Sequence, residues 1–139
     1  MELLVVIAIT VILVAVAVPL YGNLQVSAQL NERSAELTQT LRSAQERAAS
    51  GVNDASHGLK LFSDRYVFYQ GDSYDTRASA YDRNIKFDSS LTLTTDLSGE
   101  EINFNRAGIP NKTGKIILQH AVNGNRTITI NNLGAVAEE

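Results

Sequence analysis

Positions 3–21 are almost uniformly apolar. From Leu3 to Val18 the only polar side chain is Thr10, which in a helix can hydrogen-bond to a carbonyl one turn earlier. At about 1.5 Å per residue, a helix from Leu3 to Tyr21 spans about 30 Å, the thickness of the hydrocarbon core of a bilayer. A helix that is apolar all round lies in lipid or among other helices. The pattern therefore predicts a helix that the rest of this chain does not cover.

Beyond residue 22 the small and apolar positions narrow to one helical face. They recur three and four residues apart, the period of an amphipathic helix, at Ser27, Leu30, Ser34, Leu37, Leu41, Ala44 and Ala48. This stripe is expected to pack on a sheet and to end at residues 50–51; a short coiled coil is the alternative. We also expect an ion pair between Arg42 and Glu46, and a kink or local melting at Pro19 and Gly22.

Seven short β-prone runs follow, separated by turns. They cover residues 59–62, 66–69, 85–87, 91–94, 102–104, 115–120 and 126–131. The last two flank Asn123-Gly124-Asn125, a hairpin turn signal, and isoleucine alternates with threonine in the final run. Strands without interleaved helices indicate an antiparallel sheet. We predict an α+β fold: a long N-terminal α-helix, hydrophobic in its first half, packed on a C-terminal antiparallel β-sheet domain.

The boundaries expected for this organisation follow from the composition. Residues 1–22 form a hydrophobic half-helix, 23–50 an amphipathic half-helix and 51–139 the β domain. Charged residues make up 19% of the 139 residues and the net charge is −3. This balance excludes a highly charged disordered chain and argues against nucleic acid as the main partner. The chain has no cysteine, which excludes a disulfide, a cysteine–zinc site and a thiol nucleophile.

Enzyme motifs are absent from the sequence. No Gly-x-Ser-x-Gly elbow and no glycine-rich phosphate loop occurs. The two histidines, His57 and His120, lack a helical ligand spacing; His57 is expected in a loop and His120 at a strand end. We therefore expect no enzyme, no cofactor and no metal site.

A polar segment at residues 71–84 is long enough to suggest a function. Asp72, Asp75 and Asp82 offer oxygen ligands for Ca²⁺, but their spacing is not that of an EF-hand and Arg77 and Arg83 offset their charge. A solvated loop is the favoured interpretation. Four tyrosines lie in and before this segment: Tyr66, Tyr69, Tyr74 and Tyr81. They could form a surface patch, but half of them are more simply interpreted as strand residues that pack in the core.

A group of basic residues surrounds the glycine at position 108. Arg106, Lys112 and Lys115 form a small group of positive charges there, whereas the tail at residues 134–139 ends in two glutamates. Phosphates are repelled by such a tail, so DNA binding is not expected.

The acid at the start of the apolar run needs its own explanation. A cleaved signal peptide has a basic n-region, but this segment carries Glu2. A second interpretation is a simple transmembrane anchor. A charge within the apolar zone then costs roughly 2.5–3.5 kcal/mol on insertion scales, so Glu2 must lie at the membrane–water interface or have a partner of opposite charge. A third interpretation is a helix that lies first in a membrane and afterwards in a protein assembly.

Residues 2–9, Glu-Leu-Leu-Val-Val-Ile-Ala-Ile, closely resemble the start of type IV pilins and type II secretion pseudopilins. In that family a basic leader is cleaved ahead of a segment such as Phe-Thr-Leu-Ile-Glu-Leu-Leu-Val-Val-Ile-Ala-Ile. Glu2 matches the family's glutamate, and Pro19, seventeen residues later, matches its helix-kinking proline. The pattern from Phe104 to Val136 is similar to that of GspH/FimT-like pseudopilins. The resemblance implies a leader and further mature residues ahead of Glu2, so either the true N-terminus lies upstream or the start was assigned at an internal Met.

The resemblance also implies a function. It indicates a structural subunit held in the inner membrane as a single-pass precursor, cleaved by a prepilin peptidase and moved by an inner-membrane assembly platform into a homo-oligomeric helical filament. The filament is an extracellular pilus or a periplasm-spanning pseudopilus. Glu2 is expected to meet the N-terminal amine of an adjacent subunit, and the expected assembly residues are Glu2, Leu3, Val6, Ile7, Thr10, Pro19 and Gly22.

Two alternatives stay open. One is a minor, GspH/FimT-like pseudopilin at the tip of a type II secretion or DNA-uptake filament. The other is a membrane-anchored binding domain that forms no polymer, for which Glu2 is dispensable.

Overall fold

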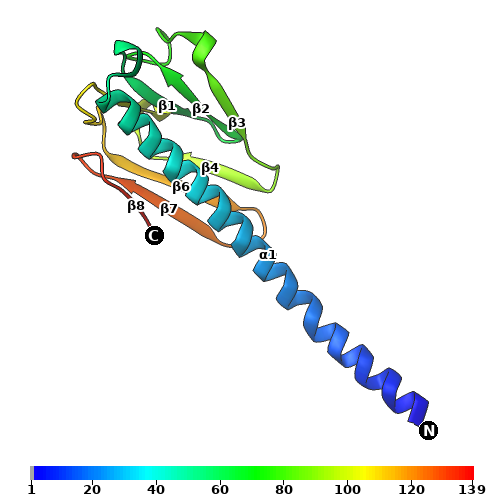
Figure 1. Ribbon diagram of the computed structural model, residues 1–139. Helices are drawn as coiled ribbons and strands as arrows, with labels where there is room; N and C mark the ends of the chain where they lie inside the picture. Colours follow the sequence, from blue (N-terminus) through cyan, green and yellow to red (C-terminus); the bar gives the residue numbers. More distant parts are fainter. Residues whose placement is uncertain (1) are drawn as a thin grey trace.

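The computed structural model describes residues 2–139, the side chains of residues 17–20 excepted (Figure 1). One long helix, α1 (Glu2–Ala49), runs from the N-terminus into a β domain. The strands of that domain are β1 (His57–Leu61), β2 (Arg65–Gln70), β3 (Arg83–Lys86), β4 (Leu91–Thr95), β5 (Glu101–Phe104), β6 (Gly114–His120), β7 (Asn125–Ile130) and β8 (Val136–Glu138). Three single-turn 3₁₀ helices lie in the connections: η1 (Val52–Asp54) between α1 and β1, η2 (Ser79–Tyr81) between β2 and β3, and η3 (Ser98–Glu100) between β4 and β5.

The strands form two four-stranded sheets, and every paired strand is antiparallel. One sheet has the order β3-β2-β1-β5 and the other β4-β6-β7-β8. The second half of α1 packs across both sheets, against β1 and β5 of the first and β6, β7 and β8 of the second (Figure 1). The predicted α+β fold is confirmed. All seven predicted strands are present, and β8 is the strand that the pattern missed.

The predicted stripe is the buried face of α1, with one exception. Of its members, the six from Leu30 onward are buried: Leu30, Ser34, Leu37, Leu41, Ala44 and Ala48. Ser27 is exposed, which corrects the prediction. One turn further along the helix, Gly124 of the turn after β6 lies against the buried Leu30.

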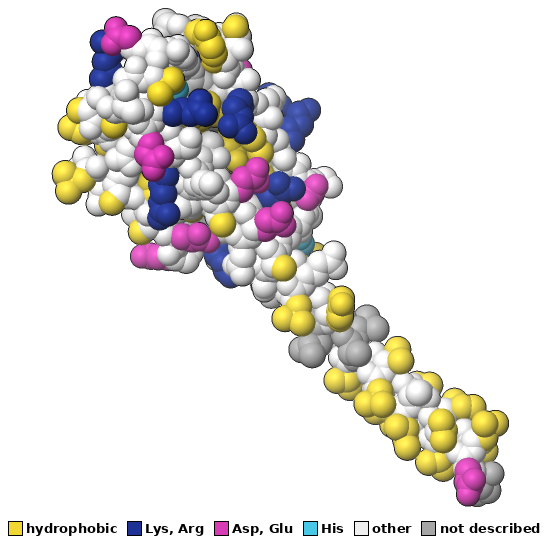
Figure 2. Space-filling view, viewed as in Figure 1, with side chains coloured by type: hydrophobic (Ala, Val, Ile, Leu, Met, Phe, Trp, Pro, Cys, Tyr) yellow, Lys and Arg dark blue, Asp and Glu magenta, His cyan; other side chains and the backbone are white. Residues whose placement is uncertain are grey.

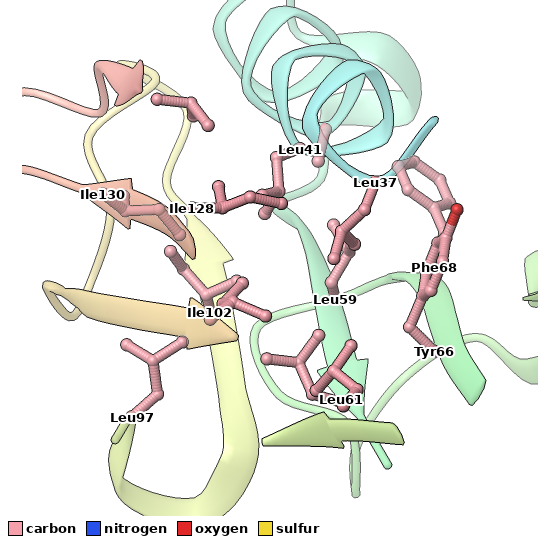
Figure 3. Close-up of a cluster of buried hydrophobic side chains, with 14 of the residues drawn as sticks. Leu37, Leu41, Leu59, Leu61, Tyr66, Phe68, Leu97, Ile102, Ile128 and Ile130 are labelled. Atoms are coloured by element: carbon pink, nitrogen blue, oxygen red, sulfur yellow. The ribbon is translucent and has the colours of Figure 1, made fainter. Parts of the chain in front are cut away.

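The core lies between the helix and the two sheets. Leu37 and Leu41 point from α1 toward Leu59 of β1 and Ile128 of β7, with Ile102 of β5 between them (Figure 3). All five side chains are fully buried. Burying a leucine or isoleucine side chain is worth about 1.5–3 kcal/mol, so these contacts hold the second half of the helix on the domain.

The helix ends where the sequence predicted. Gly51 adopts the left-handed conformation at φ 69°, which costs glycine nothing, and the amide of Ser50 donates to the Glu46 carbonyl at 2.8 Å. The expected pair between Arg42 and Glu46 is wrong for the described side chains. The Arg42 Nη2 instead donates to the carbonyl of Val136 at 3.3 Å, because β8 lies beside the helix.

A kink or local melting at Pro19 and Gly22 was the other expectation for α1; the melting is wrong, and the kink stays a prediction. The backbone is helical without interruption through these positions. A proline removes one backbone donor from the helix, while the hydrogen bonds of the flanking turns remain available. The side chain of Pro19 lies outside the described residues.

Candidate assembly surface

The first half of α1 projects from the domain with its apolar side chains uncovered (Figure 2). The large apolar residues from Leu3 to Val16 have exposed fractions between 51% and 74%. The helix is long and apolar enough to cross a membrane, and none of its most apolar stretch is buried. Soluble monomers rarely expose a continuous apolar surface of this extent, so the segment requires lipid or protein around it.

The predicted assembly residues lie along this surface. Leu3, Val6, Ile7 and Thr10 are three and four residues apart and share one exposed face, and Glu2 is exposed in the first turn. Gly22 lies further along, in the exposed turn before the domain. The structure therefore brings four of the seven onto one face and separates Gly22 from them.

Polar groups on this surface are satisfied within the helix or confined to its end. The Thr10 hydroxyl donates to the carbonyls of Val6 at 2.5 Å and Ile7 at 3.0 Å, as predicted. No charged side chain occurs between Glu2 and Glu32. The carboxylate of Glu2 is thus the single charge over the first 31 residues of the sequence, and the helix N-terminus favours an acid in that place.

Small residues leave room for another helix to approach. Beside Ala15 the helix surface has a shallow hollow bounded by Thr10, Val11 and Val14. Helices without a hydrophobic driving force between them associate through small residues that allow close backbone approach. The small side chains at this place suit close approach by another helix.

Polar contacts fix the direction in which the free half projects. The Gln45 Nε2 donates to the carbonyl of Gly108 at 2.9 Å, and the Arg126 Nε donates to the Asn31 Oδ1 at 2.8 Å. The Ser34 hydroxyl donates to the carboxylate of Glu138. Sequence reasoning missed Gln45, although its position one turn beyond the buried Leu41 is a usable signal.

The polar segment at residues 71–84 is held by internal bonds. Asp72 accepts from the Ser56 hydroxyl at 2.7 Å, and Asp82 pairs with Arg77 at 2.7 Å. Among the described residues no group of three acidic or histidine side chains converges as a cation site would require. Asp72 and Asp82 are therefore each held by a partner of their own.

The tyrosines divide as the sequence suggested. Tyr66 and Tyr69 are fully buried on β2, whereas Tyr74 is half-buried and Tyr81 exposed. The Tyr69 hydroxyl donates to Glu101 at 2.8 Å and accepts from the Asn103 amide at 3.2 Å, and burial raises its pKa. This network stabilises the start of the polar segment, because Asn103 also donates to the Gly71 carbonyl at 2.7 Å.

The basic residues near Gly108 do not gather into a patch. Arg106 pairs with Asp54 at 2.7 Å, and the Lys112 ammonium donates to the Ser98 carbonyl. Both positive groups are thus bound by other residues of the domain itself.

The histidines occupy strand positions. His120 ends β6 as predicted. The prediction of a loop for His57 is wrong: it begins β1, is 1% exposed, and its ring lies 5.8 Å from that of Phe68. The run recognised in the sequence starts two residues later, at Leu59, because Gly58 interrupts the apolar pattern.

Burial of His57 predicts a dependence of stability on pH. Desolvation lowers its pKa from 6.5 and outweighs the hydrogen bond to the Ala55 carbonyl, which raises the pKa; the nearby charge of Arg47 also lowers it. As pH falls through about 6.5, the unfolded chain binds a proton that the folded chain does not, so the free energy of unfolding falls. One such group contributes at most about 1.4 kcal/mol per pH unit. Chemical denaturation between pH 7.5 and 5.5 is expected to show this slope and His57→Leu to lack it; equal slopes would contradict it.

Sequence comparison alone identifies no relative. No protein-family model matches the chain, and no curated protein sequence matches it. Two solved structures match its fold, both of the type IV minor pilin FimU from Pseudomonas aeruginosa. One superposes with a TM-score of 0.66 at 17% identity and covers 81% of this chain and 90% of that one. The second crystal form gives 0.60 at 19%, covering 79% and 92%.

The chain has a type IV pilin fold. The match extends over four fifths of the chain, which is more than the β domain alone, so it includes part of the helix as well. In this chain the exposed apolar surface of α1 lies outside the domain, where neither sheet covers it (Figure 1).

Proposed function

We propose that this protein is a pilin-like structural subunit of a type IV pilus or related filament. The observation that carries the proposal is the uncovered apolar half of α1 projecting from a folded domain. In the precursor this half-helix spans the inner membrane. In the filament it packs against the equivalent helices of other subunits, so contacts with lipid are exchanged for contacts of similar apolarity.

Glu2 sets the axial position of one subunit on the next in this proposal. Its carboxylate meets the positively charged N-terminal amine of an adjacent subunit, and no other charge competes along the first 31 residues. Removing one partner of a buried charge pair typically costs about 3–5 kcal/mol, since it leaves the other uncompensated. The packing face beside it is formed by Leu3, Val6, Ile7 and Thr10. Pro19 and Gly22 lie further along α1, toward the β domain.

A prepilin peptidase and an inner-membrane assembly platform are the partners that this function requires. The precursor needs removal of a leader ahead of Glu2, and extraction from lipid needs an external machine, because moving the apolar run into water is unfavourable. Residues 1–22 are the membrane and filament-core segment, 23–50 the segment carried by the domain, and 51–139 the surface domain.

A minor subunit is the second candidate, and the similarity to the minor pilin FimU favours it. Such a subunit sits at a filament tip or primes assembly and contacts heterologous subunits. A type II secretion pseudopilus is built on the same kind of N-terminal helix. The two filament types are therefore distinguished by the kind of filament from which the chain is recovered.

Mass spectrometry of material sheared from producing cells tests the proposal. A chain that dominates the filament pellet, with its mature N-terminus slightly upstream of Glu2, is a processed major pilin. Trace amounts in the same pellet indicate the minor role. A chain confined to the membrane fraction and absent from filaments overturns the filament function and leaves an anchored domain.

A further inference from the structure

The tip of the β6–β7 hairpin reaches down the helix toward the free half. Val122, at this tip, has an exposed fraction of 78%. Its side chain lines a hollow of about 670 Å³ together with Gly22, Asn23 and Val26 of α1. The tip therefore lies level with the first turn after Tyr21, where the apolar run ends.

Contacts on both sides hold the tip in this position. The amide of Ala121 donates to the Ser90 carbonyl at 2.8 Å, and the amide of His120 donates to the Gly124 carbonyl at 3.0 Å. The amide of Val122 donates to the His120 Nδ1 at 3.2 Å. The position of Val122 relative to the helix is thus set by the fold and not by an unattached loop.

The helix beside the tip has the character of a membrane boundary. Tyr21 has an exposed fraction of 77%, and tyrosine is enriched at the level of the lipid headgroups. Leu24 is also exposed, whereas Asn23 and Gln25 are polar and uncharged. If the apolar run fills the hydrocarbon core, this turn lies within the interfacial layer, and the tip beside it lies there too.

We propose that the hairpin tip, with Val122 as its apolar contact, is a second membrane-binding element that seats the β domain on the lipid surface of the precursor. The inference rests on the proposed membrane-spanning role of α1. Apolar side chains in the interfacial layer contribute binding energy in proportion to the area they bury.

The charges near the tip agree with this partner. From Gln119 to Asn125 the hairpin carries no acidic or basic side chain other than His120, so insertion removes no fixed charge from water. The charges that flank this stretch are already held by the protein. Arg126, at the base of the hairpin, donates from its Nη1 to the Asn125 carbonyl at 3.0 Å and from its Nε to the Asn31 Oδ1 at 2.8 Å, and Asp88 accepts from the Gln29 Nε2 at 2.8 Å. An apolar residue flanked by uncharged amides suits a headgroup layer.

Single-tryptophan variants test the proposal directly, because the chain contains no tryptophan. The full chain is reconstituted into vesicles of phosphatidylethanolamine and phosphatidylglycerol, with or without brominated lipid, which quenches nearby tryptophan. Val122→Trp reports on the tip. Leu133→Trp is the matched control, since Leu133 is 76% exposed but lies at the opposite end of the domain, beside Gln45. Val14→Trp reports on the helix.

Strong quenching of Val14→Trp, intermediate quenching of Val122→Trp and none of Leu133→Trp is the expected result. Strong quenching of Val14→Trp with none of Val122→Trp overturns the tip contact and leaves the spanning helix intact. A blue shift of Val122→Trp emission without quenching shows that protein covers the tip, which also overturns it. Unquenched Val14→Trp overturns the spanning helix and the tip contact together.

Discussion

Replacing Glu2 with alanine is expected to abolish filament assembly while the β domain stays folded. The side chain is exposed at the first turn of α1, far from the buried core, so its removal takes no contact from the domain. In the filament the same change leaves an N-terminal amine without its partner in an apolar surrounding. A loss of about 3–5 kcal/mol for each subunit contact, repeated along a polymer, reduces filaments below detection.

Two companion variants separate charge from other effects. Glu2→Gln keeps the size of the side chain and removes the charge, and it is expected to fail as alanine does. Glu32→Ala removes an exposed acid from the same helix beyond the free half and is expected to assemble normally. Electron microscopy of sheared material measures filaments, and circular dichroism of the detergent-solubilised chain measures folding. Normal filaments from Glu2→Ala would refute the role of this residue.

Most of the helix could be predicted from its side chains alone. The apolar run, the stripe from Leu30 to Ala48 and the glycine stop are local patterns that a single helix expresses directly. The error at Ser27 shows the limit. The period of the helix continues through this position, but whether a position is buried depends on which parts of the β domain lie against it, and that comes from the fold.

The division into two sheets could not be predicted in the same way. Each strand run is short, and the pairing of β1 with β5 joins residues more than forty positions apart, which no local pattern encodes. β8 has a single buried residue, Val136, and therefore no alternation to detect. His57 was misplaced for a related reason, since its burial comes from Phe68 on the neighbouring strand.

The candidate surface was better specified by the sequence than the domain was. Fourteen consecutive positions from Leu3 to Val16 hold thirteen apolar side chains and Thr10, and their exposure follows because the domain has no further face to cover them. What meets this surface is not encoded in its own pattern, because lipid and a neighbouring helix present similar apolarity. The position of the hairpin tip beside Gly22 was likewise invisible, since it results from the fold.

Truncating Leu41 is expected to give the largest loss of stability among the helix residues. Its side chain is fully buried and points between the two sheets, toward Ile128 (Figure 3). Leu→Ala at such a site removes transfer free energy and leaves a cavity, which together cost about 2–5 kcal/mol. For a domain of this size the midpoint of thermal unfolding then falls by roughly 10 °C or more. Thermal unfolding of the detergent-solubilised chain, followed by circular dichroism, measures the change.

The same substitution at Leu133 provides the matched control, because that side chain is 76% exposed and its loss creates no cavity. Leu133→Ala is expected to change the free energy of unfolding by no more than about 0.5 kcal/mol. Equal effects of the two variants would show that the second half of α1 does not depend on the core for its attachment. A large loss of stability confined to Leu41→Ala would instead mean that this contact holds the helix on the domain. The direction in which the free half projects, and with it the filament surface, would then depend on the same core.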